Sequence, residues 1–122
     1  MLVEKIILDY LTERLAEEQR SDVGVFMEMP EQPLPANFVV IEKTGSARIN
    51  RVCTDNFAIQ SCSTSLLSAA ILNALIKKLM DGIVFLSAIG AAHLDTDYNF
   101  TDPTTKVYRY QAVYRISYIL ED

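Results

Sequence analysis

Side chains that commonly perform chemistry in proteins are few in this chain and widely spaced. The sequence has a single histidine, His93, and two cysteines, Cys53 and Cys62. An extended run would hold the two cysteines about 30 Å apart, so no disulfide between them is expected. A zinc site of the Cys/His type could be completed only by carboxylates or by a second chain. We therefore predict no bound metal and no cofactor.

One acidic segment resembles the beginning of a calcium loop. Asp95, Asp97 and Asn99 stand at alternate positions, as the first ligands of an EF-hand do. The sixth position of such a loop is normally glycine and here is Phe100, and the twelfth, normally glutamate, is Lys106. The segment is therefore predicted to be a solvated hairpin tip with local polar turns. A weak calcium or partner contact is the alternative.

No other motif indicates catalysis. The chain has no glycine-rich phosphate loop and no Gly-x-Ser-x-Gly motif. Serine and threonine are frequent at 61–68, but none has a recognisable base, and helix capping explains several of them. His93 is interpreted as a structural or solvent-facing residue. We therefore predict that the protein is not an enzyme.

Composition places the chain among single-domain globular proteins. Its 122 residues are expected to form one domain, 1–122. A net charge of −5, with eleven scattered Lys and Arg residues, disfavours nucleic-acid and anionic-membrane partners. The apolar stretches are shorter than the ~20 residues of a membrane span. The first residues carry Glu4 and Lys5 and do not resemble a secretory signal, so a cytoplasmic protein is expected.

Hydrophobic periodicity predicts two helices. Apolar residues spaced three and four apart mark an amphipathic helix over about 1–18. A second helix is predicted over about 66–81, with a serine or threonine cap at 63–65 and Gly82 as a left-handed C-terminal residue. This second helix is apolar around almost its whole circumference. Either it is enclosed by the core or part of it packs on another subunit.

Alternating apolar and polar residues predict the strands. They are a short strand at 23–29, a hairpin of 38–43 and 56–62 with a long polar tip, and a hairpin of 85–98 and 106–120. Three prolines make 30–37 a stiff connecting loop. The order of elements predicts an α+β fold with a single, mainly antiparallel β-sheet and two helices packed on one face.

Several segments together resemble one known family. They are Phe38-Val-Val-Ile-Glu-Lys-Thr-Gly, Ala58-Ile-Gln-Ser-Cys before an alanine-rich helix, Asp97-Tyr-Asn-Phe-Thr-Asp, Tyr108-Arg-Tyr-Gln-Ala-Val-Tyr and the N-terminal Met-Leu-Val-Glu-Lys helix. In this order, along nearly the whole chain, they are similar to the small tail-completion, or tail-terminator, proteins of long-tailed phages and prophages.

The resemblance implies a structural protein of the virion. Members of this family form a hexameric ring on the tail tube, which stops tube polymerisation and presents the surface that joins the head. The implied partners are further copies of the chain, the tail-tube protein and the head-tail connector protein, and DNA can pass through the ring. The implied location is the host cytoplasm during assembly and the virion tail afterwards. The second helix carries fewer charges than the family leads us to expect.

Two sets of residues are predicted to make the contacts of such a ring. The residues predicted to dock partners from hairpin tips are Arg48, Arg51, Asp97 and Asp102. The residues predicted to contact a neighbouring subunit from the second helix are Ile71, Leu72, Leu75 and Ile76. An ordinary solvated loop is the alternative for the two arginines.

Two other functions stay open. A head-tail connector or stopper protein has a similar size and also assembles as a ring. A small ligand-binding or enzymatic α+β domain would instead use the tyrosine-rich face of the last strand as a pocket. That alternative predicts a monomer or dimer with a deep cleft.

Overall fold

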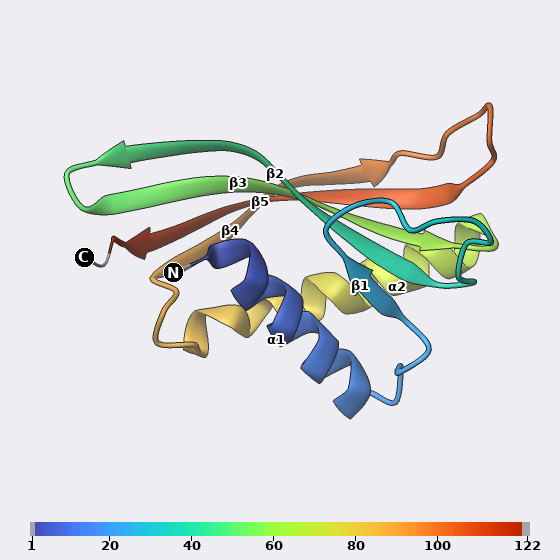
Figure 1. Cartoon of the computed structure of the whole chain (residues 1–122), viewed down its shortest axis with the longest axis horizontal. Helices are drawn as coiled ribbons and strands as arrows, with labels where there is room; N and C mark the ends of the chain where they lie inside the picture. Colours follow the sequence, from blue (N-terminus) through green and yellow to red (C-terminus); the bar gives the residue numbers. More distant parts are fainter. Residues whose placement is uncertain (1, 121–122) are drawn as a thin grey trace.

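Two helices cover one face of a single sheet in the computed structural model, which describes residues 2–120 (Figure 1). The helical elements are α1 (Val3–Glu17), α2 (Leu66–Asp81) and a short 3-10 helix, η1 (Ile83–Phe85). The strands are β1 (Gly24–Phe26), β2 (Phe38–Ile49), β3 (Val52–Ser63), β4 (Ala91–Asn99) and β5 (Tyr108–Ile119).

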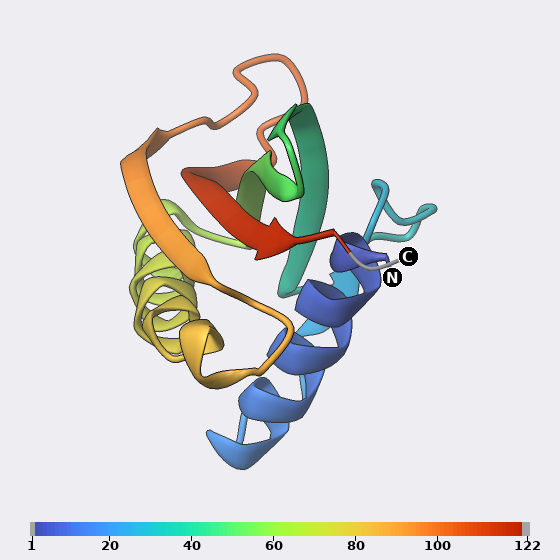
Figure 2. The same cartoon turned by 90° about the vertical axis from the view of Figure 1, so that its left-hand side faces the viewer.

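The sheet has the strand order β1-β2-β3-β5-β4. Its neighbours pair in antiparallel fashion except for β1 and β2, which are parallel. Both helices lie on the same side of the sheet (Figures 1 and 2). The prediction of an α+β fold with a single, mainly antiparallel sheet and two helices is therefore confirmed.

Period-two alternation along the central strands builds the core. Side chains of β2, β3 and β5 that share a face point towards the helices and are buried, and they include Val39, Ile41, Phe57, Ile59, Ala112, Tyr114 and Ile116. A buried stripe on α1 packs against these side chains; its residues are Val3, Ile7, Tyr10, Leu11 and Leu15. The opposite sheet face has a smaller apolar cluster of Phe38, Val40 and Cys62, packed against Phe26, Leu34 and Val107.

The end of α1 is closed by two backbone hydrogen bonds. The Arg20 amide donates to the Leu15 carbonyl at 2.8 Å, and the Gln19 amide donates to the Ala16 carbonyl at 3.1 Å. This is the pattern of a Schellman motif, which requires a left-handed residue just after the helix. Gln19 fills that position with φ of 60°, a conformation that costs a residue with a Cβ about 1–2 kcal/mol.

The ends of α2 differ in part from the prediction. Ser65 caps the helix, because its Oγ accepts a hydrogen bond from the Ser68 amide at 3.1 Å. The expected left-handed conformation of Gly82 is wrong, since its φ is −89°. Glycine is needed there for space: a Cβ would lie 2.8 Å from the Tyr10 hydroxyl oxygen, which donates to the Leu79 carbonyl at 2.6 Å.

The first hairpin has long strands and a short tip, where a long polar tip was expected. Residues 45–49 continue β2 and pair with 52–56 of β3, after a register shift between Lys43 and Gly45. Asn50, with φ of 57°, begins the two-residue turn. Residues 52–55 also pair with 116–119 of β5. We call residues 44–55 and 116–119 the arm. The arm projects beyond the helices (Figure 1).

The segment before β4 was also predicted wrongly, because the strand begins at Ala91 and not near Phe85. The apolar run there includes η1 and a loop held to the core by buried Ile83 and Ile89. These residues are apolar because they anchor a loop in the core. An apolar run of this kind has the same sequence pattern as a buried strand, so a strand was predicted. The strand predicted at 23–29 is shortened to Gly24–Phe26.

Replacing Gln19 by glycine should stabilise the protein. Gln19→Gly removes the left-handed strain at the end of α1 and should raise the free energy of unfolding by about 0.5–1 kcal/mol. Urea unfolding followed by circular dichroism measures this change. The matched control Ala16→Gly, at an exposed helical position, should lower it by a similar amount. An unchanged or less stable Gln19→Gly variant would contradict the strain assignment.

Candidate functional site

One side of α2 shows large aliphatic side chains to solvent. Leu66, Leu67 and Ile71 are 39%, 72% and 55% exposed. We call these three residues the α2 ridge. The helix is thus apolar on the core side and on the outer side, which matches its unusual composition.

The predicted subunit contact on α2 is partly wrong. Leu72 and Ile76 are fully buried against the sheet and cannot reach a neighbouring subunit in this fold. Leu75 is half-buried beside the same core, and Ile71 is exposed. A helix turns by about 100° per residue, so Ile71 and Leu72 face different directions. Apolar residues surround most of this helix, so the sequence gave no clear signal for which face is inside.

A second exposed apolar surface lies at the end of the arm. Ile49, Val52 and Ile119 are 77%, 46% and 58% exposed. Val52 is opposite Ile49 on β2 and opposite Ile119 on β5, so the three side chains share a sheet face. This is the face away from the helices. We call these three residues the arm patch. The polar residues around Ile49 and Val52 predicted a polar tip, so the sequence gave no sign that both lie on a strand surface.

The four predicted docking residues do not form one surface. Arg48 is exposed on the arm, and the Arg51 guanidinium at the turn donates to the Leu120 carbonyl. Asp102 lies in the β4–β5 connection, at the other end of the long axis of the molecule (Figure 1). Docking by Arg48 and Arg51 stays a prediction, but Asp102 cannot belong to the same contact.

Both predicted acids have structural partners. Asp97 lies within β4 and not on a hairpin tip; its carboxylate accepts from the Asn73 amide at 3.2 Å and pairs with Lys77 at 3.2 Å, which ties β4 to α2. The Asp102 carboxylate accepts a hydrogen bond from the Thr104 backbone amide at 2.9 Å, and this bond lowers its pKa. The expected placement of Asp97 on a hairpin tip is therefore wrong, and its docking role stays a prediction.

The histidine and the two cysteines, which could perform chemistry, lie at separate places in the fold. His93 is exposed, 3.6 Å from the Asp95 carboxylate, which Arg115 also binds at 2.9 Å. Both cysteines are free and buried, and burial raises the pKa of the Cys62 thiol to about 11. Within residues 2–120, no group of three or more His, Cys, Asp or Glu side chains could hold a metal ion.

A buried polar cluster joins the three strands of the arm. The Asp55 carboxylate, from β3, is fully buried and accepts hydrogen bonds from the Tyr118 hydroxyl at 2.9 Å and the Ser46 hydroxyl at 2.8 Å. Lys43 Nζ lies 4.0 Å from Asp55 and 3.6 Å from the Glu4 carboxylate, at the start of α1. Burial, followed by the bond to Asp55, raises the pKa of Tyr118. The cluster fixes the arm to the body of the protein.

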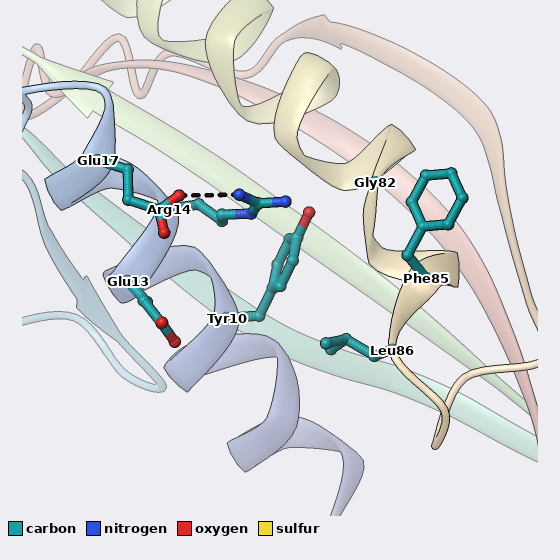
Figure 3. Close-up of a pocket in the computed structure, with 7 residues that line it drawn as sticks. All are labelled: Tyr10, Glu13, Arg14, Glu17, Gly82, Phe85 and Leu86. Atoms are coloured by element: carbon teal, nitrogen blue, oxygen red, sulfur yellow. Dashed lines mark hydrogen bonds and ion pairs between the residues drawn. The ribbon is translucent and has the colours of Figure 1, made fainter.

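A hollow of about 210 Å³ lies between α1 and η1 (Figure 3). Its lining residues are Tyr10, Glu13, Arg14, Glu17, Gly82, Phe85 and Leu86. Arg14 pairs with Glu17 at 2.8 Å and lies 5.5 Å from the centre of the Tyr10 ring. Pockets for organic ligands usually measure ~300–1,000 Å³, so this one is small for such a ligand.

The tyrosine-rich face of β5 is not an open cleft over its central part. Tyr114 is buried in the main core, beneath the helices. The ligand-binding alternative places its pocket on this face. The space it requires is occupied there by the protein's own side chains.

The chain matches no protein-family model, and no curated protein matches it. In the part of the chain that is described, none of the helices has the length and apolar character needed to cross a membrane.

Removing the Tyr118 hydroxyl should destabilise the arm. Tyr118→Phe leaves the buried Asp55 carboxylate without one of its donors and should cost about 1.5–3 kcal/mol of unfolding free energy. Urea unfolding measures the loss, and amide hydrogen exchange should be faster in residues 52–55. The control Thr54→Val removes the weaker 3.3 Å contact with Ser117 on the other sheet face and should cost less than about 1 kcal/mol. Equal losses in both variants would contradict the special role of Asp55.

Proposed function

We propose that this chain is a structural assembly protein that caps a phage tail tube, ends its polymerisation and forms the surface that joins the tail to the head. The observation that supports the proposal is the α2 ridge. One face of this helix fills the core, while Leu67 and Ile71 on another face are more than half exposed. Exposed aliphatic surface of this kind is stabilised by contact with another protein.

The resemblance to tail-terminator proteins supplies the type of assembly. It implies a hexameric ring, whose subunits each need two different contact surfaces. The α2 ridge and the arm patch are two such surfaces. The contacts with the tail-tube protein and the head-tail connector protein belong to this proposal, as does the non-enzymatic role. A negatively charged ring would also let DNA pass without holding it.

Each exposed patch is small, as expected for a protein that assembles only when its partner is present. Specific interfaces bury ~800 Å² per partner, and three aliphatic side chains provide only part of that area. A free subunit would therefore contact other copies only weakly and briefly until the tail tube presents several copies side by side. Premature rings would otherwise block the assembly pathway.

Association with the tail-tube protein tests the proposed function. The wild-type chain should co-sediment with tubes of the tail-tube protein from the same phage. The double variant Leu67→Asp/Ile71→Asp should stay folded, since neither side chain is part of the core, and should lose at least tenfold in bound protein because burying two charges opposes the contact. Quantitative sedimentation and circular dichroism are the two readouts.

The matched control is Thr12→Asp, an exposed position on α1 away from the ridge, which should bind as the wild type does. Binding of the wild type to the connector protein but not to the tail tube would favour the connector alternative. Failure of the wild type to bind either protein would contradict the proposal.

A further inference from the structure

We infer that the arm patch of one copy packs on the α2 ridge of the next copy, so that subunits join head to tail. This inference rests on the proposed function, because it specifies the subunit contact of the proposed ring. The observations are the matching chemistry of the two patches, their positions in the molecule and their size.

The two patches match in chemistry, and they are of two kinds of surface that this fold already packs together. Each has three large aliphatic side chains, and the sequence from Thr64 to Ile76 contains no charged residue. The ridge is a helix surface and the arm patch is a sheet surface. The chain already packs these two kinds of surface together internally, where Leu72 and Ile76 of α2 lie in one core with Phe57 of β3.

The two patches lie too far apart to meet within one chain. The β2–β3 turn is at one end of the long axis, and the start of α2 is at the other end (Figure 1). A contact between two copies therefore leaves one patch and one ridge free for further copies. A head-to-tail contact of this kind repeats, and a suitable rotation closes it into a ring.

The small size of the patches favours contacts within a closed ring over a single contact in an isolated dimer. Complete burial of a Val, Leu or Ile side chain removes ~60–120 Å² of apolar surface from water. Three side chains per partner thus bury a few hundred Å² at most, against the ~800 Å² per partner of a stable complex. Ring closure gives each subunit two such contacts, and the tail tube raises the effective concentration of the copies.

The arm also has an unpaired edge, which offers a competing contact. Strand β1 pairs only with Phe38–Val40 of β2, so among residues 2–120 no strand pairs with 41–49 on that side. Pairing of two such edges would be symmetric and would give a closed dimer. Disulfide trapping distinguishes this symmetric dimer from head-to-tail packing.

Disulfide trapping between two purified variants tests the inference. Ile49→Cys in the arm patch and Leu67→Cys in the ridge are purified separately, reduced, mixed and oxidised. A mixed disulfide dimer should form at least tenfold faster than homodimers of either variant alone. The double variant Ile49→Cys/Leu67→Cys should give a ladder of products that ends at the ring size. The native cysteines Cys53 and Cys62 are buried, so they contribute little background.

Val84→Cys is the matched control, because Val84 is an exposed aliphatic residue outside both patches. Mixed products with Val84→Cys as abundant as those with Leu67→Cys would overturn the inference. Homodimers of Ile49→Cys alone would instead indicate arm-to-arm pairing and would also overturn it, as would the absence of any mixed product at the highest soluble concentration.

The outcomes distinguish this contact from the proposed function. If the wild-type chain binds the tail tube and no mixed disulfide forms, the head-to-tail contact is wrong and the capping function stands. If the mixed disulfide forms and the wild-type chain does not bind the tail tube, the contact stands and the capping function is wrong.

Discussion

The structure depends on the coverage of one sheet face by two helices. The central strands are 12 residues long and span about 40 Å, whereas the 16-residue helix α2 spans about 24 Å. The strands must therefore extend beyond the helices. Where this cover ends, Asp55 and Tyr118 replace apolar side chains on the same sheet face. The arm is a direct result of this difference in length.

The position of α2 on the sheet also decides which of its side chains are exposed, because this helix is apolar on two sides. The side with Leu72 and Ile76 completes the core, and Leu67 and Ile71 on the outer side are more than half exposed. A solvated helix normally carries charged residues on its outer face. Before Lys77 the outer side of α2 carries no charged residue, which is costly for an isolated subunit and useful for one that assembles. The same helix therefore completes the core with one side and supplies the proposed contact surface with the other.

Strong periodicity in the sequence was sufficient to predict the fold class and the limits of α2. Local patterns failed where tertiary contacts decide the structure. Asp55 looked like part of a polar tip because its buried partner, Tyr118, lies 63 positions away in the sequence. Ile89 looked like part of a strand because it anchors a loop. The glycine at position 82 is explained by its contact with Tyr10, which no local pattern reveals.

The candidate surfaces were harder to predict than the fold. Sequence showed that α2 has too much apolar surface, but the direction of its buried face depends on packing against β3 and β5. Electron microscopy of tail-tube protein polymerised with and without this chain tests the central claim most directly. If the chain caps the tube, the tubes should be shorter and should carry a ring of this protein at one end. Tubes of unchanged length with bare ends would contradict it.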